Sequence, residues 1–204
     1  MLSERLQIFV DYALKSKKTI FYDVCCDHAL VALELEKKQY FTKLYAVDQS
    51  QTIIERLKKR HQNSAVNFVA KRGQELRIEN ALVLIAGVGL ATVIKILEES
   101  SSSHCDYIIS SHTHSPKLRY YLQENFYQYQ EGKLIKEGRH FYDIVSVGGV
   151  RPGRRSSFFQ GKELQNREYL GLWGDYYRRK RDIHLYPESQ EVLALEKKLS
   201  GGLK

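Results

Sequence analysis

Short apolar runs alternate with amphipathic segments along the first 150 residues of the chain. The runs are rich in β-branched and aromatic residues, which predicts strands at residues 19–24, 43–47, 65–70, 81–85 and 107–110. Between them, apolar positions three and four residues apart predict amphipathic helices. These helices are expected to start after Ser3 and after Ser50 and to cover residues 29–38, 90–98 and 117–125.

The last part of this region has a different pattern. Residues 127–136 and 140–147 alternate between apolar and polar positions, and Glu137-Gly138-Arg139 separates them, which indicates a hairpin. Strands that alternate with helices of about ten residues imply right-handed βαβ units and a parallel sheet covered on both faces. We therefore expect one α/β, Rossmann-like domain at residues 1–150, with a seven-stranded, mostly parallel sheet that ends in an antiparallel hairpin.

The composition changes after Gly148-Gly149. The chain carries a formal net charge of +8. Residues 151–181 contain nine Lys or Arg against three Asp or Glu, so much of the excess lies there. Residues 151–204 are expected to form a short, basic helical extension, and such a charge favours a polyanion such as RNA. The alternative is a solvated helix face. The residues expected to contact RNA here are Arg151, Arg154, Arg155, Arg178, Arg179, Lys180 and Arg181.

Several classes of protein are disfavoured by composition. The longest nearly uninterrupted apolar run, residues 81–94, has 14 residues, and a membrane-spanning helix needs about 20. The first ten residues contain Glu4 and Arg5 and lack the apolar core of a signal peptide. Three cysteines, two of them adjacent, do not suggest a disulfide framework. We expect a cytoplasmic protein without membrane contact.

Polar residues follow three of the predicted strands, at the edge where open α/β sheets bind ligands. These are residues 23–28 after the first strand, Asp48 after the second, and Ala86-Gly87 after the fourth. A carboxylate in the position of Asp48 can accept hydrogen bonds from a ribose diol, although an aspartate at a solvated turn is the alternative. The first loop has no glycine and carries two carboxylates, which would repel phosphates but suit a sulfonium and an ammonium. This loop favours S-adenosylmethionine over NAD or ATP.

These motifs have a counterpart in a known family, because the chain resembles the bacterial tRNA (adenine-22 N1) methyltransferases from about residue 2 to residue 147. The matching pieces are Leu2-Ser3-Glu4-Arg5-Leu6, Asp23-Val24-x-x-Asp27-His28-Ala29, Ala46-Val47-Asp48, Ile85-Ala86-Gly87-Val88-Gly89, Arg119 with Leu122, and Phe141-Tyr142-Asp143-Ile144. The resemblance implies a class I methyltransferase fold, S-adenosylmethionine as the donor and N1 of a tRNA adenine as the acceptor. It further implies that the C-terminal helical region helps to hold tRNA.

The resemblance also implies roles for individual residues. Those expected to bind the cofactor are Asp23, Cys25, Cys26, His28, Asp48, Gln49, Gln74, Ala86 and Gly87. Arg5 and Arg119 join the residues expected to bind RNA. Cys25-Cys26 stands where the family has Gly followed by Ser or Thr, and Gln74 would contact the adenine amino group as an amide. Ser110-Ser111-His112 replaces the family's Gln-Pro-Asn, in the segment that faces the acceptor base.

The expected chemistry needs no base, because N1 of adenine attacks with a lone pair and the product ring is cationic. The protein must align the reactants and stabilise the developing positive charge. Asp27 is the candidate for this stabilisation, and His112 is the second candidate catalytic residue. Asp27 could also cap the following helix, and His28 is expected to orient Asp27 or the cofactor carboxylate.

Other chemistries are less consistent with the sequence. His112 and His114 have no third ligand at a recognisable spacing, so no metal is expected. Cys26 is not expected to be a catalytic thiol, because neighbouring acids raise the pKa of a cysteine. A catalytically degenerate, RNA-binding module is the main alternative to an active tRNA methyltransferase, and the basic tail disfavours a small-molecule substrate. The sequence leaves the oligomeric state open.

Overall fold

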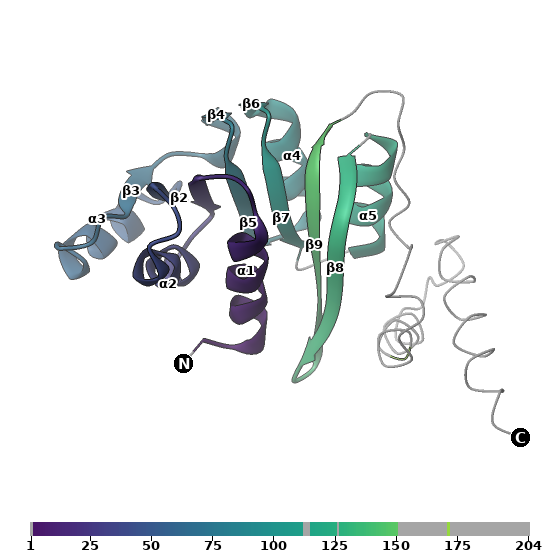
Figure 1. Cartoon of the computed structure of the whole chain (residues 1–204), viewed down its shortest axis with the longest axis horizontal. Helices are drawn as coiled ribbons and strands as arrows, with labels where there is room; N and C mark the ends of the chain where they lie inside the picture. The colour runs from purple at the N-terminus through teal and green to yellow at the C-terminus, as the bar shows by residue number, and fades with distance from the viewer. Residues whose placement is uncertain (1, 112–114, 126, 151–170, 172–204) are drawn as a thin grey trace, which may run out of the picture.

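A seven-stranded sheet organises the computed structural model, which describes residues 2–111, 115–125, 127–150 and 171 (Figure 1). The strand order is β3-β2-β1-β5-β7-β9-β8. The strands are β1 (Ile20–Val24), β2 (Lys43–Asp48), β3 (Asn67–Ala70), β5 (Leu82–Val88), β7 (Asp106–Ser111), β8 (Tyr127–Glu137) and β9 (His140–Val150). The first five are parallel, and β9 runs antiparallel to both β7 and β8. The predicted sheet and terminal hairpin are confirmed.

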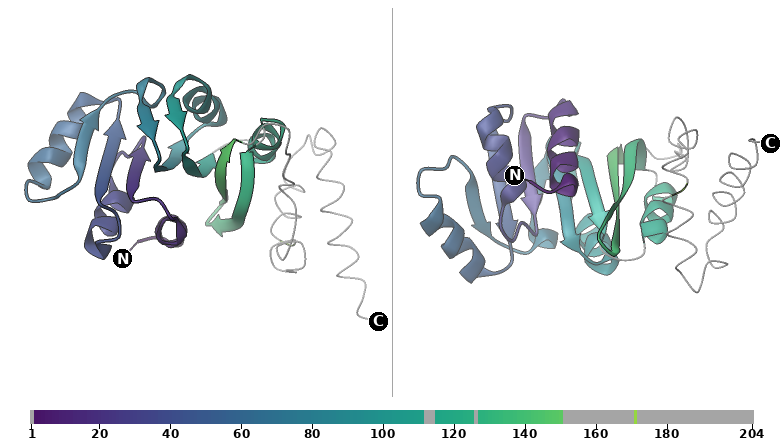
Figure 2. Two further views of the ribbon diagram at one scale, coloured as in Figure 1. Left: turned by 45° about the horizontal axis from the view of Figure 1, so that its top comes forward. Right: turned by 90° about the horizontal axis from the view of Figure 1, so that it is seen from below.

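Helices cover both faces of the sheet, as the alternation of elements predicted. They are α1 (Glu4–Lys15), α2 (Leu30–Lys38), α3 (Gln51–Arg60), α4 (Leu90–Glu99) and α5 (Ser115–Glu124). The first three pack into one apolar cluster and the last two into another, and Figure 2 shows α1 and α2 opposite α4. Within the described residues, none of these helices has the length and apolar character needed to cross a membrane.

Strand β5 illustrates why its sequence is uniformly apolar. Leu82 and Leu84 belong to the cluster formed with α1, α2 and α3. Val83 and Ile85 belong to the cluster on the opposite face. Because successive side chains of a strand point to opposite faces, a strand covered on both sides needs apolar residues at every position.

The helix starts agree with the sequence at two places and differ at a third. Ser3 caps α1 and Ser50 caps α3, each hydroxyl accepting a bond from the backbone N–H three residues later. Helix α2 instead begins after Ala29, whose backbone is left-handed and which makes no side-chain cap bond. The alternative role of Asp27 as the cap of this helix is therefore wrong.

A small second sheet was not predicted. The single-turn helix η1 (Gly73–Glu75) leads into β4 (Arg77–Glu79), which pairs with β6 (Ser101–Ser103). Three-residue strands carry too little periodicity to be recognised in a sequence. A Cβ on Gly73 would lie 2.8 Å from Cγ1 of Val24, so a glycine lets η1 approach the sheet closely.

The β8–β9 hairpin extends past the carboxyl ends of the parallel strands. Strand β9 pairs with β7 only through residues 145–147, whereas its pairing with β8 continues to Glu137 and His140. Residues 132–142 are here called the hairpin overhang. Gly132 pairs with Val145 at the last position that β9 shares with β7, and the residues after it continue past that pairing toward the tip of the hairpin (Figure 1). The predicted basic extension at residues 151–204 lies outside the described part of the chain, apart from residue 171.

Candidate functional site

A cavity of about 260 Å³ opens at the carboxyl ends of β1 and β5. It brings together six of the residues predicted to bind the cofactor, together with Asp27 and several residues of α1 and α2. The lining residues are Arg5, Leu6, Phe9, Asp23, Cys25, Cys26, Asp27, His28, Leu30, Val31, Leu84, Ala86 and Gly87. The cavity therefore lies at the edge of the sheet where the sequence predicted a ligand site.

The loop between β1 and α2 has an alternating left-handed backbone. Cys25, Asp27 and Ala29 have φ angles of 63°, 43° and 52°, all positive. Side chains at such positions cost of order 1–3 kcal/mol each and are found most often where a site requires them. Hydrogen bonds hold the loop in place, from Cys26 N to Val47 O at 3.1 Å and from Ala29 N to Cys26 O at 2.7 Å.

Asp48 connects the first two strand ends. Its Oδ1 accepts a bond from Ser50 N at 2.9 Å, and its Oδ2 accepts one from Asp27 N at 3.3 Å. The carboxylate thus fixes the loop after β1 as well as the start of α3, which an aspartate at an ordinary solvated turn would not do. Gln49 is exposed and Gln74 half-buried. Asp48, Gln49 and Gln74 lie outside the lining of the cavity.

Asp23 is the buried acid of the site, only 6% exposed at the end of β1. Its pKa is raised to about 7, mainly by burial; a hydrogen bond from the backbone of Ala32 lowers the pKa, and the nearby charge of Asp48 raises it. A carboxyl group that titrates near neutral pH beside a cavity is typical of a functional site. A cation bound in the cavity would favour its ionised form.

Asp27 and His28 lie together at the mouth of the cavity. His28 Nε2 is 3.3 Å from Asp27 Oδ2, and a guanidinium nitrogen of Arg56 is 3.8 Å from Asp27 Oδ1. Both Asp27 and His28 side chains are 60% exposed. The expected contact between His28 and Asp27 is present, and the Asp27 carboxylate remains accessible from solvent.

The two adjacent cysteines are free thiols and half-buried. Burial, with added repulsion from Asp48 and Asp23, raises the pKa of Cys25 to about 11. Burial and the same two carboxylates also raise the pKa of Cys26. Both thiols are therefore protonated at neutral pH, and neither is suited to nucleophilic attack.

Arg5 adds a positive charge to the lining of the cavity, whereas the sequence analysis expected this residue to bind RNA. Its guanidinium carbon lies 4.3 Å from the centre of the Tyr142 ring, and its side chain lines the cavity rather than an open surface. Among the described residues, no group makes a hydrogen bond to its buried Nε. A buried donor without a partner is costly, so this nitrogen is well placed for an anionic group of a ligand. Only the family resemblance singled out Arg5 in the sequence.

Arg119 does not contact RNA, and that prediction is wrong. Its guanidinium donates to both carboxylate oxygens of Asp143, from Nε to Oδ2 at 2.7 Å and from a terminal nitrogen to Oδ1 at 2.6 Å. Both side chains are completely buried. The pair joins α5 to β9 inside the protein, where no phosphate can reach it.

Several predicted residues lie outside the part of the chain that the structure describes. His112 lies outside the described residues, as do Arg151, Arg154, Arg155, Arg178, Arg179, Lys180 and Arg181. Where the structure does describe the chain, it contains no group of three or more His, Cys, Asp or Glu positioned to hold a metal ion.

Comparisons with known proteins match the same region of the chain. The sequence model of a family described as a methyltransferase domain matches residues 2–145. A Mycoplasma pneumoniae protein, provisionally assigned as a tRNA methyltransferase, is 24% identical over 153 residues, which cover 72% of this chain and 71% of that protein.

Two solved structures share the fold along the full chain. M. capricolum TrmK in complex with S-adenosyl-homocysteine, its natural cofactor product, has a TM-score of 0.72 at 21% identity, and both chains are covered completely. The m1A22 tRNA methyltransferase TrmK of B. subtilis has a TM-score of 0.63 at 16% identity, covering 100% of this chain and 99% of that one. At these identities the two structures establish the fold.

Proposed function

Because the chain belongs to the methyltransferase-domain family, we propose that it transfers a methyl group from S-adenosylmethionine to N1 of an adenine in tRNA. The observation that carries the proposal is the cavity at the ends of β1 and β5, which is lined both by acidic groups and by one half-buried arginine, Arg5. The tRNA part rests on the similarity to tRNA-modifying proteins and on the net charge of +8.

The charged groups of the cavity match the amino-acid end of the donor. A carboxylate suits Arg5, whose buried Nε has no partner among the described residues, and also His28, which lines the same cavity. An ammonium and a sulfonium suit the acidic side, where Asp23 is buried and Asp27 lies at the mouth. When bound, S-adenosylmethionine would supply an electrophilic methyl group activated by the sulfonium.

The nucleoside end of the donor needs a separate contact. Ligand sites commonly have volumes of about 300–1,000 Å³, so a cavity of about 260 Å³ suits the amino-acid end better than the whole donor. We assign the ribose to Asp48, which adjoins the loop that lines the cavity. Gln49 and Gln74 are proposed to contact the rest of the nucleoside.

Asp27 is the proposed stabiliser of the charge that develops on the adenine ring. Its carboxylate is exposed at the cavity mouth and is oriented by His28 and Arg56. An oriented charge at the reacting centre commonly contributes a factor of about 10²–10³ in rate. His112 stays a second proposed catalytic residue, and the basic residues of the C-terminal extension stay proposed contacts to tRNA. We propose that the protein acts in the cytoplasm.

A catalytically inactive RNA-binding protein is the competing function, and the Cys25 side chain favours it because it lines the cavity from a strained backbone position. The deciding experiment is incubation of the protein with methyl-labelled donor and total tRNA, followed by nucleoside analysis. We expect labelled 1-methyladenosine in the tRNA and a loss of label in the Asp48→Ala variant. Tight binding of tRNA without any transfer would instead support the inactive module.

A further inference from the structure

The hairpin overhang, residues 132–142, carries an unusually basic surface. Lys133, Lys136, Arg139 and His140 are all exposed there. Glu137 is the one acid among residues 132–142, and its Oε1 accepts a bond from the backbone N–H of Arg5 at 3.0 Å. Lys133 lies 3.3 Å from Glu4, which leaves Lys136 and Arg139 as the charges most available to an external anion.

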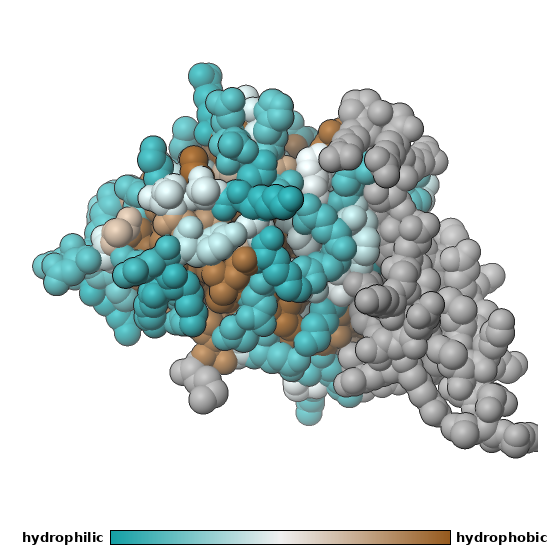
Figure 3. Space-filling view, in the orientation of Figure 1, coloured by the Kyte–Doolittle hydropathy of each residue, from teal (hydrophilic) through white to brown (hydrophobic). Residues whose placement is uncertain are grey.

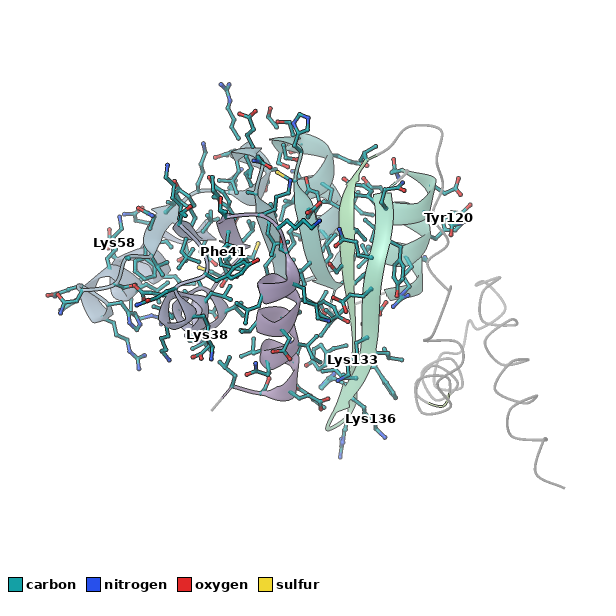
Figure 4. All side chains as sticks on the ribbon, in the orientation of Figure 1. Lys38, Phe41, Lys58, Tyr120, Lys133 and Lys136 are labelled. Atoms are coloured by element: carbon teal, nitrogen blue, oxygen red, sulfur yellow. The ribbon has the colours of Figure 1, made fainter. Side chains whose placement is uncertain are left out.

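The overhang lies on the same edge of the sheet as the cavity. It extends past the end of β7, and Figure 4 places Lys133 and Lys136 toward its tip, next to the start of α1. Tyr142 of the overhang packs against Arg5, whose side chain lines the cavity. Helix α1 therefore separates the cavity from the basic surface by the width of a single helix.

The base of the overhang is rigid. The buried bidentate pair of Arg119 and Asp143 ties β9 to α5. A Cβ on Gly132 would lie 2.8 Å from a terminal nitrogen of Arg119, so a glycine lets β8 pass close to the pair. Leu134 and Ile135 are buried. The basic side chains are thus presented by a preformed arm, which lowers the conformational entropy lost on binding.

We propose that the hairpin overhang contacts the phosphate backbone of the RNA substrate and holds it beside the donor cavity. The proposal rests on the proposed function, since a substrate that reaches the cavity mouth from this side must pass the overhang. Lysine and arginine contacts to phosphates supply affinity and register without reading sequence. Figure 3 shows hydrophilic residues over this end of the hairpin, as a phosphate-binding surface requires.

The test compares two charge-reversal variants. Lys136→Glu/Arg139→Glu changes the overhang, and Lys58→Glu/Lys59→Glu changes the exposed end of α3, near the opposite edge of the sheet (Figure 4). Both variants alter the net charge equally. We expect the tRNA affinity of the overhang variant to fall at least about tenfold at 0.1 M salt. The slope of log affinity against log salt concentration should become less steep by the equivalent of about two phosphate contacts. The tRNA affinity of the α3 variant should change by less than about threefold.

Calorimetric binding of S-adenosyl-homocysteine by each variant checks that the fold and cavity are intact, and the neutral variant Lys136→Gln/Arg139→Gln should show an intermediate loss. Equal losses in the overhang and α3 variants, or no loss in either, would overturn the inference. Transfer to tRNA with a normal KM in the overhang variant would reject the inference and leave the proposed function standing. If tRNA binding depends on the overhang but no methyl group is transferred, the inference stands and the proposed function is rejected.

Discussion

Arg119 and Asp143 form a bidentate ion pair with both side chains completely buried, at the point where α5 meets the β8–β9 hairpin. Removing one member of such a pair leaves an uncompensated charge in the interior, which typically costs 3–5 kcal/mol. The pair therefore fixes the base of the hairpin rather than a ligand.

We expect Arg119→Met to lower the free energy of unfolding by about 3–5 kcal/mol, measured by urea denaturation. The double variant Arg119→Met/Asp143→Leu should recover much of this loss, because it leaves no charge unpaired. A single-variant loss below about 1 kcal/mol would show that the pair is not desolvated as the structure has it.

Donor binding should depend on pH through Asp23. Burial raises the pKa of this carboxyl to about 7, and a cationic donor requires the ionised form. At pH 6 only about a tenth of the molecules carry the carboxylate, so the apparent Kd for S-adenosylmethionine should be about tenfold weaker than at pH 8. Isothermal calorimetry at the two pH values measures this. Asp23→Asn should bind weakly at both, and a wild-type affinity that is independent of pH would refute the role of Asp23.

Asp23 also makes the stability of the unliganded protein depend on pH, and this dependence has the opposite direction: stability falls as the pH rises, whereas donor binding strengthens. Because the pKa of Asp23 is higher in the folded than in the unfolded chain, its neutral form favours folding at low pH. This contribution is complete below about pH 4 and is lost as the pH rises through about 7. Denaturation curves recorded between pH 5 and pH 8 should show this decrease in the free energy of unfolding for the wild type and not for the Asp23→Asn variant.

Replacing Cys25 with glycine should help both folding and binding. The φ angle of 63° suits glycine, so we expect Cys25→Gly to raise the free energy of unfolding by about 1 kcal/mol and to strengthen binding of S-adenosyl-homocysteine by opening the cavity. Cys26→Gly is the matched control, since its φ is not positive. It should lower stability by about 0.5–1 kcal/mol. If both variants lose stability alike, strain at Cys25 is not significant.

Arg5 can be tested with two ligands that differ only in the amino-acid end. Loss of a charge-assisted hydrogen bond costs about 1.5–3 kcal/mol, so Arg5→Met should bind S-adenosyl-homocysteine about 10- to 100-fold more weakly. Binding of 5′-methylthioadenosine, which lacks the carboxylate, should change little, and Arg5→Lys should restore part of the affinity. Equal losses for the two ligands would mean that Arg5 acts only by supporting α1.

The fold could be predicted because its signals are local. The apolar runs and the capping residues Ser3 and Ser50 placed the strands and two of the helix starts. The start of α2 could not be predicted in detail, because a left-handed Ala29 depends on the tertiary contacts of the loop rather than on its own preference.

The site was partly predictable for a similar reason. Asp23 and Gly87 follow directly from the positions of strand ends. The environments of Arg5 and Arg119 depend on partners that are distant in sequence, Tyr142 for the first and Asp143 for the second. Nothing near either arginine indicates whether it faces a cavity, the interior or solvent, and the predicted RNA contact of Arg119 failed for this reason.

The N-terminal turn of α1 touches both the cavity, through Arg5, and the overhang, through the ion pair of Glu4 with Lys133. Any extension fused ahead of Ser3 would emerge between the two. Purification tags placed there would shield Lys133 and crowd the cavity mouth, so enzymological work should use a cleavable or relocated tag before a weak activity is taken as a property of the protein.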